Sequence, residues 1–225
     1  MAVDAGNLYV GGRFSDAGGL ANADWVARWD GVAWHAMGAA PCGVHAIAVS
    51  KTGDVYAGGA FNSVGTQDIA FLARWDGASW HGVGSGVDGQ VAALAADPAG
   101  NVYVGGFFDH AGGVANTVHI ARWHEDSASW QALGTGIPGI VVAALAVDWP
   151  SAVYAGGTFH SAGGVPAEYI ASWNGSTWSA LGSGTNDMVD AIAVTGSDVY
   201  VGGSFTGAGG HKANRIARWD GSDWS

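Results

Sequence analysis

Short stretches in which hydrophobic and polar residues alternate recur along the whole chain, separated by glycines. Four of them follow one another at 91–96, 101–105, 120–123 and 130–133. Alternation with a period of two is typical of β-strands, and Asp-Gly pairs such as Asp76-Gly77 supply the positive φ angles that tight hairpins need. No helical period of 3.6 persists anywhere. The pattern predicts a unit of four antiparallel strands.

This unit is repeated five times. Aligning the tyrosines of the five Tyr-Val/Ala-Gly-Gly motifs gives steps of 47, 47, 51 and 46 residues, from Tyr9, Tyr56, Tyr103 and Tyr154 to Tyr200. Two tryptophan ladders run in step with them, at Trp29, Trp75, Trp123, Trp173 and Trp219, and at Trp34, Trp80, Trp130, Trp178 and Trp224. A phenylalanine ladder comprises Phe14, Phe61, Phe108, Phe159 and Phe205. We expect these aromatic ladders to form the core.

A repeat of this length with four strands is typical of a β-propeller blade. The first strand of each unit is rich in alanine, as at 91–96 and 142–147, so we expect it to lie nearest the crowded axis. The predicted fold is therefore all-β: a five-bladed β-propeller of four-stranded antiparallel blades. It is expected as a single domain, residues 1–225, with blades at approximately 1–39, 40–86, 87–136, 137–184 and 185–225.

The repeat also resembles a known family. Gly-Gly after Val-Tyr-Val, followed by an aromatic residue and later by Ile-Ala-Arg-Trp-Asp-Gly-Ser, resembles the kelch-like repeats of Rax2-type cortical-marker proteins and of bacterial secreted propellers. The resemblance covers the whole chain. It implies extracellular or cell-surface interaction modules and carries no catalytic residues.

Composition and charge narrow the function classes. The chain has 225 residues, of which 39 are Gly and 48% hydrophobic, and a formal net charge of −11. The hydrophobic content argues against disorder, and the scarcity of Lys and Arg argues against nucleic-acid binding. No apolar run is long enough for membrane insertion. Cys42 is the one cysteine, so no intramolecular disulfide forms. The first residues lack the pattern of a signal peptide, yet an extracellular location is favoured.

The length of the chain bears on whether the ring closes. Five full units would need about 239 residues, so the first and last strands are clipped, and we find no strand that completes one end from the other. We expect a closed five-bladed ring. The alternatives are part of a longer array, completed by further residues or a second chain, and an open or swapped assembly. The protein is expected to be a monomer if the ring closes and to self-associate otherwise.

One column of the repeat varies where the others do not. Four residues before each third-strand tryptophan stands a large planar side chain, namely Trp25, Phe71, His119, Tyr169 and Arg215. By strand alternation it shares a face with those tryptophans, at the edge of the long loops between strands two and three. Planar side chains there suit the apolar faces of sugars, and packing against the next blade is the alternative explanation. These five residues are the candidate ligand-binding site.

Other repeated residues predict structure rather than chemistry. Arg28, Arg74, Arg122 and Arg218 share a strand face with Asp30, Asp76 and Asp220, which predicts local ion pairs. The histidines near the loops show no repeated spacing of metal ligands, and no catalytic motif is present. We therefore expect no metal, no cofactor and no enzyme activity.

The predicted function is that of a non-catalytic interaction or scaffold module binding a protein or glycan ligand on the loop face. Two alternatives remain open: a multivalent, lectin-like carbohydrate-binding propeller, and an engineered or excised repeat protein without a native ligand.

Overall fold

The computed structural model describes residues 1–225 and contains five main antiparallel sheets, each built from one consecutive segment of the chain. Sheet 1 comprises β1 Ala2–Asp4, β2 Asn7–Gly11, β3 Val26–Trp29 and β4 Trp34–Ala36. Sheet 2 comprises β5 Val44–Val49, β6 Val55–Gly59, β7 Leu72–Trp75 and β8 Trp80–Gly82. Sheet 3 comprises β9 Gln90–Ala96, β10 Asn101–Phe107, β11 Ile120–His124 and β12 Ser129–Gln131.

Sheets 4 and 5 follow the same order of strands. Sheet 4 comprises β13 Gly139–Asp148, β14 Ala152–Phe159, β17 Ile170–Trp173 and β18 Trp178–Ala180. Sheet 5 comprises β19 Val189–Thr195, β20 Asp198–Gly203 and β23 Ile216–Trp219, and a single bridge between Trp219 and Trp224 stands for its outer strand. The four-stranded unit expected from the alternating pattern is confirmed.

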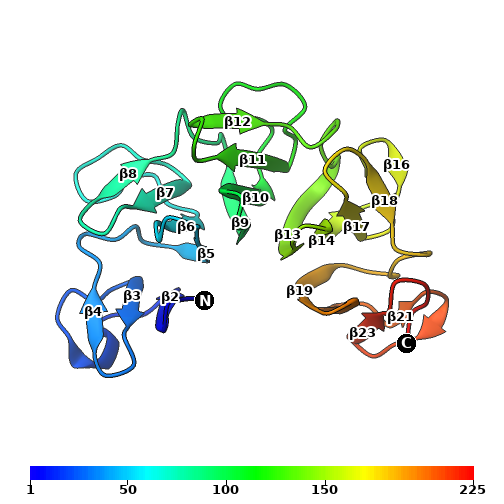
Figure 1. Ribbon diagram of the computed structural model, residues 1–225, viewed down its shortest axis with the longest axis horizontal. Coiled ribbons are helices and arrows are strands. Elements are labelled where there is room, and N and C mark those ends of the chain that lie inside the picture. The colour runs from blue at the N-terminus through cyan, green and yellow to red at the C-terminus, as the bar shows by residue number, and fades with distance from the viewer.

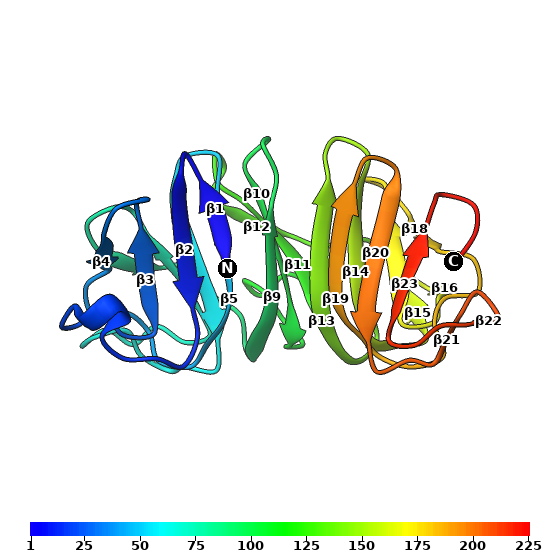
Figure 2. The ribbon, with the colours of Figure 1, turned by 90° about the horizontal axis from the view of Figure 1, so that it is seen from below.

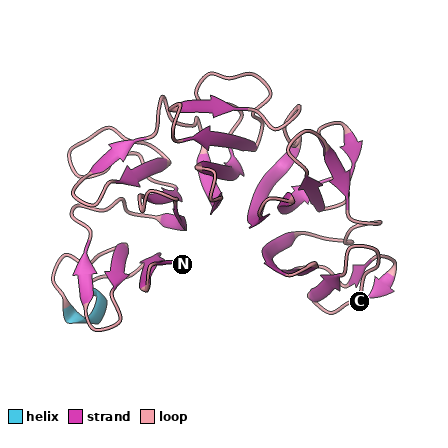
Figure 3. Cartoon of the chain, viewed as in Figure 1, coloured by secondary structure: helices cyan, strands magenta, loops and turns pink.

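The loops between the second and third strands lie at one edge of the molecule. They hold the 3-10 turn η1 (Ala17–Gly19) and two small hairpins, β15 Ser161–Ala162 with β16 Val165–Pro166 and β21 Gly207–Ala208 with β22 His211–Lys212. Figure 2 shows η1 and both hairpins at the lower edge, with the turns between the first and second strands at the upper edge. Strands make up nearly all of the regular structure (Figure 3).

The five sheets lie along an open arc. The first strands of the sheets point to the inside and the tryptophan-bearing outer strands to the outside, as the alanine-rich first strands predicted (Figure 1). The expected closed ring is not what the structure shows, because sheets 1 and 5 stand apart at the two ends of the arc (Figure 1). The rotation from each sheet to the next is set by the packing of their facing side chains. Four such rotations do not bring sheet 5 back to sheet 1.

The core lies between the sheets. Each of its four hydrophobic clusters joins two neighbouring sheets. We call the side of a sheet that meets the following sheet its trailing face, and the opposite side its leading face. At the junction of sheets 3 and 4, Tyr103, Ile120 and Leu133 form the trailing face. They contact the leading face formed by Val153, Phe159 and Trp178.

The Gly-Gly pair after the second strand permits this close approach. A Cβ on Gly156 would lie 2.5 Å from Cγ1 of Val189 in the next sheet. A Cβ on Gly157 would lie 2.1 Å from the carbonyl oxygen of Val141, next to the irregular register of β13. Neither position has room for a side chain. The first glycine permits close packing against the next sheet, and the second permits close packing against the first strand of its own sheet.

Tryptophans of the outer strands tie one sheet to the one before it. The indole Nε1 of Trp80, Trp178 and Trp224 donates to the carbonyl oxygen of Met37, Leu133 and Leu181 at 2.7, 2.9 and 2.8 Å, respectively. The corresponding Nε1 of Trp130 is buried without a partner. Each outer-strand tryptophan also packs against the third-strand tryptophan of its own sheet, with ring centroids 5.4–5.5 Å apart.

Candidate binding surfaces

The column of planar side chains has a shared backbone conformation. All five residues have positive φ, between 58° and 66°, and each precedes the third strand by one residue: Trp25, Phe71, His119, Tyr169 and Arg215. Each residue is held by two backbone hydrogen bonds; the N–H of Tyr169 donates to Phe159 and its carbonyl accepts from Gly157. Because these residues lie before the third strand and have positive φ, the alternation of side chains along a strand does not apply to them. The expectation that they share a face with the third-strand tryptophans therefore loses its support.

The structure does not bring the five column residues together, because each belongs to a different sheet and makes local contacts. His119 Nδ1 donates to the carbonyl oxygen of Ile137 at 2.9 Å, and Tyr169 meets the ring of His160 edge-on at 5.2 Å between centroids. Four members of the column are half-buried and Arg215 is exposed. Ligand binding by this column stays a prediction.

The trailing face of sheet 5 is uncovered. Ile216 is 67% exposed, whereas its counterparts Val26, Leu72, Ile120 and Ile170 are at most 1% exposed. Tyr200 is exposed too, while Tyr9, Tyr56 and Tyr103 are buried. A Cβ on Gly202 would meet nothing nearer than 3.8 Å, although one on Gly58, Gly105 or Gly156 would lie 2.3–2.7 Å from a valine of the next sheet. The trailing face of sheet 5 thus has the same kinds of residue as the trailing faces of the other sheets, but no following sheet covers it.

The leading face of sheet 1 is the other half of such a junction. Val10, Phe14 and Trp34 are half-buried there. Their counterparts in sheet 4, Ala155, Phe159 and Trp178, are buried. The exposed ends of the arc therefore present both halves of a contact that occurs four times inside the chain.

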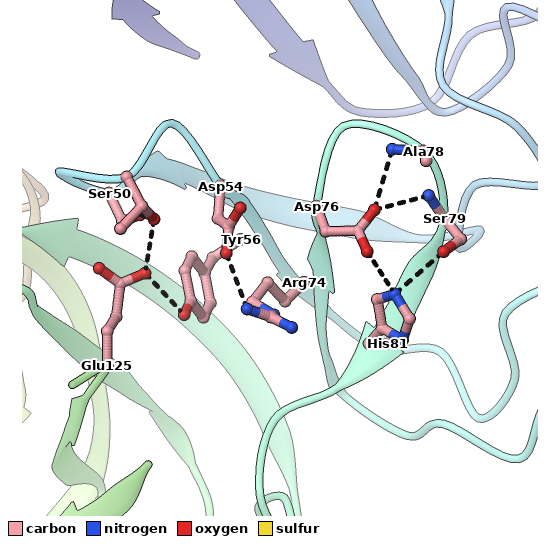
Figure 4. A network of polar contacts seen from close by, with 10 residues as sticks. Ser50, Asp54, Tyr56, Arg74, Asp76, Ala78, Ser79, His81 and Glu125 are labelled. Carbon is pink, nitrogen blue, oxygen red and sulfur yellow. Dashed lines mark hydrogen bonds and ion pairs between the residues drawn. The ribbon is translucent and has the colours of Figure 1, made fainter. Parts of the chain in front are cut away.

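A polar network joins sheets 2 and 3 at the edge of their hydrophobic junction (Figure 4). Glu125 accepts a hydrogen bond from the Tyr56 hydroxyl at 3.0 Å. Burial, followed by the negative charge of Glu125, raises the pKa of Tyr56 well above its ordinary value. A salt bridge between Lys51 and Asp126, 2.8 Å from Nζ to Oδ2, crosses the same junction.

The expected arginine ion pairs form with different partners. Arg74 pairs with Asp54, immediately before β6, at 2.8 Å, and Arg218 pairs with Asp198, in β20, at 3.4 Å. The prediction of pairs with the turn carboxylates is wrong, because these accept backbone N–H groups within their own turns. Asp76 accepts from Ala78 and Ser79 and lies 2.7 Å from His81 Nε2, and these contacts lower its pKa to about 2 (Figure 4).

The surface shows no metal-binding cluster of side chains. No three His, Cys, Asp or Glu side chains gather closely enough to hold a metal ion, and the loop histidines His110 and His160 instead pair singly with Asp88 and Glu168. No helix has the length and apolar character that a membrane crossing takes.

A cavity that sequence reasoning missed lies between sheets 3 and 4, on the edge opposite the long loops. Asn101, Tyr103, Arg122, Trp149 and Asn174 are among its lining residues. Two sequence signals mark the region: the 51-residue step from Tyr103 to Tyr154, and the seven-residue spacing of Trp123 and Trp130, against five in the other units.

Comparison with known proteins identifies the fold of this chain. No family model matches the chain, and no curated protein does. Among solved structures, the extracellular domain of a hybrid two-component system from B. thetaiotaomicron aligns over 99% of this chain and 26% of its own, with TM-score 0.61 and 12% identity. The GH74 enzyme of Niastella koreensis aligns over 98% and 35%, with TM-score 0.60 and 15% identity. The WD40 repeats of RRP9 align over 79% and 48%, with TM-score 0.52 and 13% identity.

These identities are low, so the likeness is one of fold alone. The chain spans less than half the length of each of these three matched structures. Taken with the series of antiparallel sheets around an inner row of first strands, they establish a β-propeller repeat fold. From here each sheet is also called a blade.

Proposed function

We propose that this chain is a non-catalytic interaction module, a kelch-like propeller array of the Rax2 type, whose binding surfaces are its two end faces. The end faces are the trailing face of sheet 5 and the leading face of sheet 1. The observation that carries the proposal is Ile216, 67% exposed at a position that is closed in every other sheet. Burying such a side chain contributes roughly 1.5–3 kcal/mol, and an exposed apolar face of this kind marks an interaction site.

The occupant that fits the end faces best is a second copy of this chain. Inside the chain, a trailing face meets a leading face of the same type four times. The trailing face of one copy and the leading face of another would form a junction of this type, with the short strand β1 (Ala2–Asp4) of the partner in place of a full first strand. Because the two faces differ, the contact is heterologous.

Ile216 provides the sharpest test of the end-face proposal. In the single chain its side chain is 67% exposed, so Ile216→Glu should fold and melt like the parent. In the associated form, this side chain would be buried against the partner's leading face, as Ile170 is buried against sheet 5. Light scattering should show self-association of the parent protein and its loss in Ile216→Glu. Equal association of both proteins would contradict the proposal.

A second candidate function is multivalent carbohydrate binding by the column of planar side chains. It is favoured by the shared backbone conformation, which presents one planar side chain per sheet at the loop edge. Weak contacts at five such positions would gain avidity through repetition. A glycan array tests it: Trp25→Ala and Tyr169→Ala should each lower binding, and unchanged binding in both would exclude the column.

A further inference from the structure

The cavity between sheets 3 and 4 holds polar atoms that lack partners. It has a volume of about 270 Å³, slightly below the roughly 300 Å³ at which sites for drug-sized ligands begin. Asn101 is 5% exposed, and its amide Nδ2 donates to Asp97 Oδ2 at 2.7 Å. That bond fixes the amide so that Oδ1 is the free end, buried without a donor.

Arg122 supplies a complementary unpaired group in the same cavity. Its Nη2 donates to Gln131 Oε1 on the outer strand, while its Nε is buried without an acceptor. An unsatisfied buried polar group costs about 1–3 kcal/mol, and such groups are rare in native proteins. Asn101 and Arg122 both line the cavity, which is thus bounded by one residue with an unused acceptor and one with an unused donor; both atoms are covered in this structure, and a ligand reaches them by a shift of these side chains.

The preceding junction shows what is different here. At the position of Asn101, sheet 2 has Asp54, which pairs directly with Arg74 at 2.8 Å. Glu125 from the next sheet then reaches the tyrosine hydroxyl. At the junction of sheets 3 and 4, the facing turn is Asn174-Gly175, which brings no carboxylate. At this junction the Tyr103 hydroxyl is satisfied by Asp97 of its own sheet, but Arg122 has no carboxylate partner and its Nε is left open.

The charges around the cavity select a neutral ligand. The buried carboxylate of Asp97 accepts from the Tyr103 hydroxyl at 3.1 Å, and Asp148 lines the wall. The charged residues that line the cavity are Arg122 and Asp148, one of each sign, so neither an anion nor a cation is favoured by the net charge. A hydroxyl group both donates and accepts, so two neighbouring hydroxyls can satisfy Asn101 and Arg122 together.

An exposed aromatic surface completes the cavity. Trp149, in the turn between β13 and β14, lines it and is 49% exposed. An indole half open to solvent offers an apolar face with a polar N–H, which suits the C–H face of a sugar ring. We propose that this cavity binds a neutral pyranose sugar, with one hydroxyl donating to Asn101 Oδ1, its neighbour accepting from Arg122 Nε, and the ring against Trp149.

This inference is independent of the end faces and names a site separate from the column. It is tested by saturation-transfer NMR with three probes: methyl β-D-glucopyranoside, methyl α-D-mannopyranoside and methyl β-D-galactopyranoside. For so small a ligand, we expect at least one probe to bind with a Kd of about 1 mM or a few-fold weaker. Trp149→Ala, in an exposed turn, should weaken binding about tenfold, which corresponds to the loss of ~1.4 kcal/mol. Arg122→Lys, which keeps the charge and removes Nε, should do the same.

Matched controls separate the cavity from other surfaces. Phe107→Ala removes an aromatic side chain that is 50% exposed elsewhere, and Arg74→Lys makes the same exchange one sheet earlier. Both should bind like the parent. No binding of any glycoside, or unchanged binding in Trp149→Ala and Arg122→Lys, would overturn the proposal. Loss only in Trp25→Ala and Tyr169→Ala would assign the sugar to the column instead. Binding of N-acetylglycinamide but of no glycoside would exclude the sugar assignment.

Discussion

The hydrogen bond from Trp178 to the sheet before it should be measurable as a stability difference against Trp130. Both tryptophans occupy the same position of the repeat and are buried, at junctions of the same type. Nε1 of Trp178 donates to Leu133 at 2.9 Å, whereas Nε1 of Trp130 has no partner. Trp178→Phe therefore removes one of the two donors to the Leu133 carbonyl, which keeps the N–H of Gly136 at 3.2 Å, at a cost of about 0.5–1.5 kcal/mol. Trp130→Phe removes only an unsatisfied N–H.

The loss of ring volume is common to both substitutions and largely cancels. We expect Trp178→Phe to lower the free energy of unfolding by ~1–3 kcal/mol more than Trp130→Phe does. For a chain of this length that is a difference in Tm of roughly 2–12 °C. Urea denaturation followed by far-UV circular dichroism, which does not depend on the tryptophan signal, measures it. Equal destabilisation by the two substitutions would refute the assignment of a stabilising role to this bond.

Two further predictions concern the turns and loops. Gly163→Ala should destabilise the protein by about 1–3 kcal/mol more than Gly164→Ala in thermal melts. Both glycines have positive φ, but a Cβ on Gly163 would lie 2.4 Å from Trp178 Cδ1, whereas one on Gly164 would meet nothing within 4 Å. Equal destabilisation by the two substitutions would show that the positive φ alone decides the cost. Backbone N–H groups of Ser79 and Ala78, with His81, lower the pKa of Asp76 from 3.8 to about 2, so its contribution to stability is complete above pH 3.8 and lost as pH falls toward 2. Asp76→Asn should flatten stability over that interval in acid titration followed by circular dichroism, while an unchanged acid slope would contradict this role.

The sheets could be predicted from the sequence because the signals for them are local. In the third unit, the expected strands at 91–96, 101–105 and 120–123 lie within β9, β10 and β11. The alanine-rich inner strand was also correctly placed, since small side chains suit the crowded centre of the arc. Four copies of a junction supply four independent repetitions of the same pattern, which makes the aromatic core visible without an alignment.

The shape of the arc depends on quantities that the sequence does not display. Closure is decided by the angle between neighbouring sheets, summed over all of them. Side-chain pattern indicates which faces meet but not that angle. The expectation of a closed ring was therefore wrong for this structure, although the expectation of four-stranded antiparallel sheets was correct. Ile216 shows why: its sequence context is that of a buried residue, and only the arrangement of the sheets leaves it exposed.

The candidate sites, too, could be predicted from the sequence only in part. The column from Trp25 to Arg215 was found because it varies in identity, but its positive φ could not be read from large side chains that rarely adopt it. The cavity at Asn101 and Arg122 lies between two sheets, and its unpaired atoms are apparent only after those sheets are brought together. The longer 51-residue step marks the region.

The most direct test of the end-face proposal is to mix two variants, each blocked on one face. Ile216→Glu places a charge on the trailing face, and Val10→Glu places one on the leading face. Val32→Glu, at an 84% exposed position in the β3–β4 turn, serves as the surface control. In light scattering, each blocked variant alone should have the mass of one chain, and the control should associate like the parent.

An equimolar mixture of the two blocked variants retains one good trailing face and one good leading face. It should therefore show a species with twice the mass of the single chain and nothing larger. A mixture that stays monomeric while the parent protein associates would contradict the pairing of trailing with leading faces, and a parent protein that is monomeric at every concentration would contradict self-association altogether.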